Sequence, residues 1–243
     1  MDTTSSSPKI FVGIFADDLT GAFDAAAPFA ARGLKTFVSS THELRPVPAG
    51  AAVVSLNLGT RHMHPTDILG RVSAGVKVLA ELGPKVLFNK IDSTLRGHPG
   101  SELAAALQVL DIDRAVLCPA YPQNGRTVRD GVLLVDGVPV AETDVGRDTL
   151  SPVSSSNVAD ILSRSLVRAS LEARVDVRVG LPGDGGSPER PEIILEDATS
   201  EKSLREMAGA MVDARGTLLL AAGSAGLSAA IAARMAGHRT DNR

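Results

Sequence analysis

Two adjacent carboxylates stand where an apolar run gives way to a helix-prone segment. Asp17 and Asp18 directly follow the β-prone run Ile10–Ala16, and Thr20 comes two residues later. Carboxylates in this place can accept hydrogen bonds from substrate hydroxyls, act as a base on one hydroxyl, or hold a cation through water. Helix capping explains the same residues, because Asp18 or Thr20 can accept a backbone N–H of the first turn. The spacing alone favours neither interpretation.

The densest polar cluster follows a second apolar run. Lysine and arginine bind carboxylates and phosphates, serine and threonine make adaptable hydrogen bonds, and glycine lets the backbone approach a ligand closely. A solvated loop whose charges pair with each other is the alternative, but so many polar residues at the end of a strand favour a binding site. The candidate residues are Lys90, Asp92, Ser93, Thr94, Arg96 and Gly97.

A third candidate is the small-residue turn Gly223–Gly226, which lies between an apolar run and an Ala-rich segment. Its backbone N–H groups and the Ser224 hydroxyl can face an anion at a helix N-terminus. Such a turn also allows close packing of helix on sheet, and it matches neither the phosphate-loop pattern nor the dinucleotide fingerprint. Apart from His62 and His64, a spacing that is usually incidental, the histidines lack the spacing of metal ligands, so we expect no bound transition metal. Cys118 is expected to be an inert, buried thiol.

Alternating strand-like and helix-like segments must bring these clusters together. This order predicts an α/β fold with an open, mainly parallel sheet in three layers and helices on both faces. In such sheets ligands bind beyond the carboxyl ends of the strands, where the polar clusters fall. Asp136-Gly137 between apolar runs predicts a β-hairpin insertion near residues 121–150. Strands are expected at 10–16, 34–39, 51–57, 85–90, 114–119, 174–179, 193–195 and 218–222, and helices at 21–32, 65–82, 99–110, 157–169, about 204–212 and after 226.

The expected domain organisation is simple. Residues 1–9 form a disordered leader, residues 10–236 an α/β domain with an insertion at about 121–155, and residues 237–243 a tail.

Composition excludes several classes of protein. The chain has 243 residues, with 25 Lys and Arg against 28 Asp and Glu, and no basic cluster that would suit nucleic acid. No run approaches the roughly 20 apolar residues that cross a bilayer, and residues 1–8 lack an apolar signal-peptide core, so we expect a cytoplasmic protein with no membrane partner. A single cysteine cannot form an intramolecular disulfide.

Five motifs occur in the order found in the four-carbon acid sugar kinase family, which the chain resembles from about Ile10 to Ala236. They are ADDLTGA at 16–22, KIDSTLRG at 90–97, PAYPQNGR at 119–126, GVPVAETDVGRD at 137–148 and GSAGL at 223–227. The resemblance implies phosphorylation of a hydroxyl of threonate, erythronate or an oxo-tetronate by ATP with Mg²⁺. Family members have an N-terminal sugar-acid-binding domain and a C-terminal nucleotide-binding domain, and this chain matches only the first.

The resemblance therefore implies a small sugar-acid substrate and a nucleotide-binding domain or subunit supplied elsewhere; assembly into a homo-oligomer stays open. It implies that Asp17 and Asp18 orient hydroxyls, one of them as a base. Arg61, Lys90 and Arg96 are expected to bind carboxylate or phosphate, and Gly223 and Ser224 to face the transferred phosphoryl group. The pocket would be completed by Asp92, Ser93, Thr94 and Gly97.

Two other functions compete with this interpretation. A stand-alone module could bind or sense a small hydroxy-acid without catalysis. A metal-dependent phosphatase is disfavoured, because such sites need Asp-x-Asp and the carboxylates of Asp17 and Asp18 are adjacent.

Overall fold

The fold is built on one large parallel sheet. The computed structural model describes residues 11–44, 46–172, 174–180, 188–213 and 218–240. Within these residues, eight strands pair in the order β2-β3-β1-β4-β11-β5-β10-β9, and every pairing is parallel. The strands are β1 (Val12–Ala16), β2 (Thr36–Ser39), β3 (Val53–Asn57), β4 (Val86–Lys90), β5 (Arg114–Cys118), β9 (Asp176–Val179), β10 (Glu192–Leu195) and β11 (Leu219–Gly223).

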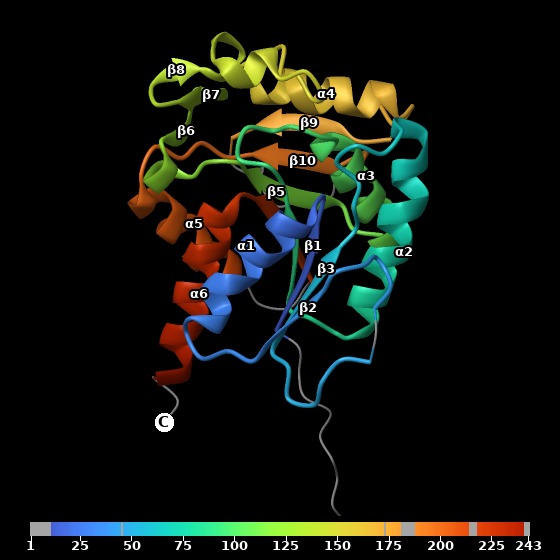
Figure 1. The fold of residues 1–243 in the computed structure, drawn as a ribbon, viewed down its shortest axis with the longest axis vertical. Helices are drawn as coiled ribbons and strands as arrows, with labels where there is room; N and C mark the ends of the chain where they lie inside the picture. Colours follow the sequence, from blue (N-terminus) through green and yellow to red (C-terminus); the bar gives the residue numbers. More distant parts are fainter. Residues whose placement is uncertain (1–10, 45, 173, 181–187, 214–217, 241–243) are drawn as a thin grey trace, which may run out of the picture.

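Helices cover both faces of this sheet. On one side α1, α5 and α6 pack together, and on the other α2 packs on α3 and α3 on α4 (Figure 1). The central strands are buried aliphatic runs, as expected of parallel strands covered on both faces. The predicted three-layer α/β architecture is confirmed. The helices are α1 (Leu19–Ala30), α2 (Ile68–Glu81), α3 (Pro99–Leu110), α4 (Val158–Arg168), α5 (Glu201–Asp213) and α6 (Ala225–Thr240).

The predicted insertion forms a small antiparallel sheet at one end of the molecule, beside α4 and at the top of Figure 1. Asp136 and Gly137 make the tight turn between β7 (Val132–Val135) and β8 (Val138–Pro139), both with positive φ. The sequence prediction missed a third strand, β6 (Arg126–Arg129), which pairs with β7. Short 3-10 turns complete the chain path at Pro65–Asp67, Pro122–Asn124, Val140–Glu142 and Asp144–Arg147.

Three other expectations concern the cysteine and the two ends of the chain. Cys118 is buried, as expected, and burial raises the pKa of its thiol to about 12. The final helix continues to Thr240, past the start of the expected tail. The expected leader, residues 1–9, lies outside the described residues.

The contact between α3 and α4 is close enough to depend on a glycine. A Cβ atom placed on Gly100 would lie 2.4 Å from the carbonyl oxygen of Leu162. Beside it, the Ser101 hydroxyl donates to the Ser165 carbonyl at 2.6 Å, and both serines are buried. The position of α4, which forms one wall of the site described below, therefore depends on a residue without a side chain.

We expect Gly100→Ala to lower the free energy of unfolding by about 1–3 kcal/mol, the usual cost of forcing an extra carbon into a packed contact. Chemical denaturation measures the change. Gly70→Ala is the matched control, because Gly70 is exposed on α2 and a new Cβ there would meet no described atom within 4 Å beyond its neighbours and its own helix backbone. The free energy of unfolding of that variant should increase by about 0.5–1 kcal/mol. Equal effects of the two substitutions would contradict the close contact.

Candidate functional site

The carboxyl ends of the central strands lie at one level of the sheet. Ala16 at the end of β1 pairs with Asn57 of β3 and with Lys90 of β4, and Lys90 pairs in turn with Gly223 of β11. The segments that follow these strands therefore begin side by side. This register brings together the polar clusters that are far apart in the sequence.

Arg61 is the centre of the first group of charges. Its Nε and Nη2 donate to the two carboxylate oxygens of Asp17 at 2.7 and 2.9 Å, and its Nη1 donates to Asp18 at 2.5 Å. Asp17 is only 2% exposed, and burial raises the pKa of its carboxyl group while Arg61 opposes that shift. The other Asp18 oxygen accepts the Gly21 N–H at 2.6 Å and caps α1. The capping interpretation of Asp18 is thus confirmed, and its role toward a substrate stays a prediction.

Asp92 organises the loop after β4. Arg96 donates to both of its oxygens at 3.0 Å, and the backbone and hydroxyl of Thr94 donate to it as well. Burial acts in the opposite direction, but these hydrogen bonds hold the pKa of Asp92 well below its ordinary value. They also hold Leu95 at φ 63°, a left-handed conformation that a leucine adopts at a cost in strain.

The remaining predicted residues lie around this centre. Lys90 is buried, and its Nζ donates to the Ile91 carbonyl at 2.9 Å. Gly97 has φ +90°, and a Cβ atom there would lie 3.3 Å from an oxygen of Asp17. Ser93 is half-buried.

The turn after β11 is tightly packed. Ser224 is buried, its hydroxyl donates to the Ala120 carbonyl at 2.7 Å, and the same oxygen accepts the Gly226 N–H at 3.1 Å. A Cβ atom on Gly223 would lie 2.7 Å from the Cys118 carbonyl. The glycine thus allows close packing of the turn, and the role of Gly223 and Ser224 toward phosphate stays a prediction.

The structure adds a buried carboxyl group that the sequence analysis did not select. Glu102 on α3 is 1% exposed, and its Oε1 accepts the Thr60 hydroxyl at 2.5 Å. Burial, reinforced by the charge of Asp17, raises the pKa of Glu102 to about 8, so it carries a proton at neutral pH. Asn89 lies close enough to lower that pKa slightly, but its amide atoms make no hydrogen bond of normal geometry with the described residues.

Glu102 makes the stability of the protein pH-dependent. Its pKa is about 8 in the folded state against an ordinary 4.5, so the folded protein binds more protons between these values and stability falls as pH rises through that range. Glu102→Gln mimics the protonated form and removes this loss. As the pH rises from 5 to 9, we expect the free energy of unfolding of the variant to increase relative to that of the wild type by on the order of 2–4 kcal/mol.

Denaturant unfolding at several pH values measures this gain, with Glu172→Gln, at an exposed position, as the control. A difference between Glu102→Gln and the wild type that does not change with pH would show that Glu102 is already ionised in the folded protein.

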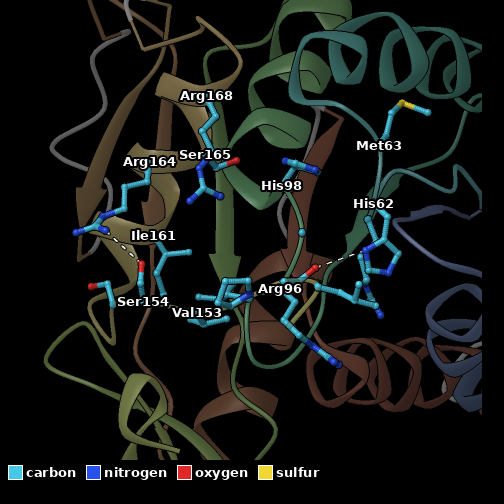
Figure 2. Close-up of a pocket in the computed structure, with 17 residues that line it drawn as sticks. His62, Met63, Arg96, His98, Val153, Ser154, Ile161, Arg164, Ser165 and Arg168 are labelled. Atoms are coloured by element: carbon cyan, nitrogen blue, oxygen red, sulfur yellow. Dashed lines mark hydrogen bonds between the residues drawn. The ribbon is translucent and has the colours of Figure 1, made fainter. Parts of the chain in front are cut away.

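A cavity of about 520 Å³ opens beside Arg61 and Arg96 (Figure 2). Residues 61–63 and 95–98 form one side of it, residues 150–155 another, and α4 the third. Of the predicted site residues, Arg61, Arg96 and Gly97 line this cavity, whereas Asp17, Lys90, Asp92 and Thr94 are buried behind them. The contribution of α4 and of residues 150–155 was not predicted.

The carboxylates of the site suit arginine better than a metal ion. Asp17, Asp18 and Asp92 all accept hydrogen bonds from arginine, and the described residues contain no group of three metal-binding side chains. Among the helices that the structure describes, none has the length and apolarity to span a membrane.

Comparison with known proteins identifies a family. The family described as "Sugar-binding N-terminal domain" matches residues 12–231. The chain is 33% identical over 235 residues to D-threonate kinase of Bordetella bronchiseptica, covering 93% of this chain and 56% of that protein. It is 37% identical over 155 residues to D-erythronate kinase of Heliobacterium modesticaldum, covering 63% of this chain and 35% of that protein. The chain thus spans about half the length, or less, of these curated relatives.

A solved structure has the same fold. It is a domain of unknown function from Bordetella bronchiseptica, a domain-swapped dimer with bound citrate, with a TM-score of 0.78 and 30% sequence identity. The match covers 95% of this chain and 58% of that one.

Proposed function

Because this chain belongs to the family of sugar-binding N-terminal domains, we propose that it is the sugar-acid-binding part of an ATP-dependent kinase. Its substrate would be a four-carbon acid of the threonate or erythronate type. One observation carries the proposal: a cavity of about 520 Å³, lined by Arg61 and Arg96, adjoins the carboxyl ends of the parallel strands, with Asp17 and Asp18 directly behind. A polyhydroxy acid needs this combination of cations for its charge and polar groups for its hydroxyls.

The geometry supports different roles for the two aspartates. Asp18 keeps 29% of its side chain exposed, so it is the carboxylate that we assign to a substrate hydroxyl. Asp17 is almost fully buried with both oxygens on Arg61, so it acts through Arg61 as a positioning residue. Phosphoryl transfer depends mainly on positioning and on stabilisation of charge. Arg61 and Arg96, with Lys90 behind them, would lie near the transferred phosphoryl group and help to position it.

Asp92 and its neighbours support this arrangement from one side. The hydrogen bonds from Thr94 and Arg96 fix the loop that carries Gly97 next to Asp17, and Ser93 lies in the same loop. We assign ATP and Mg²⁺ to a nucleotide-binding domain or subunit outside this chain, where Mg²⁺ would supply positive charge to the phosphates. Gly223 and Ser224 would lie at the interface with it.

The kinase assignment is tested by measuring ADP release. The full chain is mixed with Mg-ATP, D-threonate or D-erythronate, and the part of the Bordetella bronchiseptica D-threonate kinase that follows its sugar-binding domain. We expect ADP release that requires this chain, the added part and a four-carbon acid together. ADP release by the chain alone would contradict the assignment of ATP to another domain.

The same assay addresses the stand-alone alternative. If the chain binds a four-carbon acid tightly, yet neither this partner nor a nucleotide-binding domain encoded beside its own gene supports ADP release, the chain is a binding module without catalysis.

A further inference from the structure

The charges behind Arg61 and Arg96 already balance each other. Three carboxylates, of Asp17, Asp18 and Asp92, face three cations, of Arg61, Lys90 and Arg96. Nε, Nη1 and Nη2 of Arg61 all donate to aspartates, and Arg96 uses Nε and Nη2 on Asp92. This group of side chains has little net positive charge left with which to hold the carboxylate of a sugar acid.

The wall of the cavity formed by α4 carries a positive charge that no described carboxylate neutralises. The cavity lining includes four arginines and two histidines and no aspartate or glutamate. On α4, Arg164 is paired with Asp160 at 3.1 Å and donates to Ser154 at 3.3 Å. Arg168, one turn further along the same helix, has no ion-pair or hydrogen-bond partner among the described residues. It is therefore the lining arginine whose charge is uncompensated.

His98 faces this wall from the α3 side. Figure 2 shows Arg168 and Ser165 on α4 across from His98, whereas Arg164 lies toward Ser154. Burial lowers the pKa of His98, a backbone hydrogen bond with Met63 opposes that shift, and the positive charge of Arg168 adds to it. Nδ1 of His98 is buried and has no hydrogen-bond partner within the described parts of the chain.

We infer that Arg168 of α4, together with His98, binds the carboxylate of the substrate, and that Arg61 and Arg96 face its other end. The inference rests on the proposed function and deepens it, because it orients the substrate in the cavity. The acid group points toward α4, and the chain of hydroxyls runs toward Asp18 and Arg61. The acceptor hydroxyl then lies at the strand ends, away from the carboxylate.

This orientation makes α4 the element that distinguishes an acid from a neutral polyol. Threitol and erythritol carry a hydroxymethyl group in place of the carboxylate of threonate and erythronate. They keep the hydroxyls that would reach Asp18 but have no charge for Arg168. Loss of Arg168 should therefore weaken binding of the acids and leave binding of the polyols unchanged.

Isothermal titration of the full chain tests this with D-threonate, D-erythronate, threitol and erythritol. We expect Arg168→Gln to weaken acid binding about tenfold or more, which is the effect of losing one charge-assisted hydrogen bond. Arg168→Lys keeps the charge and should retain most of the affinity. Arg205→Gln removes the same charge from an exposed position on α5, outside the cavity, and should bind as the wild type does.

Each outcome has a defined meaning. Arg168 is exposed near the end of α4, so the variants should keep the unfolding temperature of the wild type, which is measured in parallel. If the wild type binds the acids and Arg168→Gln binds them equally well, this inference is wrong and the proposed function stands. If the wild type binds no four-carbon acid, the proposed function itself is contradicted. An equal loss for acids and polyols would show that Arg168 only shapes the cavity.

Discussion

Arg61→Ala should lower the free energy of unfolding by about 3–5 kcal/mol, a large part of the 5–15 kcal/mol that keeps a typical domain folded. The substitution leaves Asp17 with no hydrogen-bond donor among the described residues for either of its oxygens, in a place where it is 2% exposed. The cost arises because the charged Asp17 carboxylate stays buried without Arg61, rather than from the lost attraction within the ion pair itself. Denaturant unfolding at neutral pH measures it.

Two further measurements separate this explanation from a general loss of packing. Without Arg61, Asp17 escapes its unpaired charge by taking up a proton, so the variant should be less destabilised at pH 5 than at pH 8. The double variant Asp17→Ala/Arg61→Ala removes both partners and should be less destabilised than the sum of the single variants by about 1–3 kcal/mol. Additive effects that do not change with pH would refute the argument. Arg32→Ala, at an exposed position, is the control.

Asp92→Ala is expected to lower the free energy of unfolding by about 2–4 kcal/mol and to abolish binding in the cavity. Asp92 accepts from the Thr94 backbone, the Thr94 hydroxyl and Arg96, and these bonds hold Leu95 in its left-handed conformation. Without them the loop can relax, and Arg96 and Gly97 leave the cavity wall. Unfolding and isothermal titration with D-threonate measure the two effects.

Acid pH should reproduce part of this effect. The pKa of Asp92 is lowered in the folded state, so its contribution to stability is present above the ordinary aspartate pKa and is lost as pH falls below it. The wild type should therefore lose stability in strong acid more steeply than Asp92→Ala does. Asp24→Ala, at an exposed position on α1, should behave as the wild type. Parallel acid profiles for Asp92→Ala and the wild type would exclude the role given to Asp92.

Much of the fold was predictable because the strands are continuous aliphatic runs separated by helical patterns. Pro99–Leu110 was predicted with the bounds that the structure has, since proline opens a helix and small residues alternate with leucine along it. β6 was missed because Arg126–Arg129 is a short strand with arginine at both ends, directly after a proline- and glycine-rich loop. β6 forms because β7 supplies its backbone hydrogen bonds, and the sequence of β6 alone does not predict that pairing.

The candidate site was predictable where it follows from parallel strands. Asp17 and Lys90 had to lie close together if β1 and β4 were neighbours, and they are. The polar segment 57–61 was visible at the end of a strand, but a binding role was given to Arg61 only through the resemblance, because an arginine in a loop carries no signal of burial. Glu102 was missed because a glutamate in the first turn of a helix is usually explained by its favourable interaction with the helix dipole. Its burial depends on how α3 packs.

The sequence did not predict that α4 lines the cavity, for a different reason. Arg164 and Arg168 lie on an amphipathic helix at positions that normally face solvent, about 70 residues beyond Arg96 in the chain. They reach the cavity because α4, which follows the insertion, packs on α3 (Figure 1). Local patterns do not predict such packing.

The central claim is that this chain binds a four-carbon sugar acid and leaves the nucleotide to another domain. Isothermal titration of the full wild-type chain with D-threonate, D-erythronate and Mg-ATP, each in turn, tests it most directly. We predict saturable binding of at least one of the two acids and no heat of binding for Mg-ATP. Binding of Mg-ATP with no binding of either acid would contradict the claim.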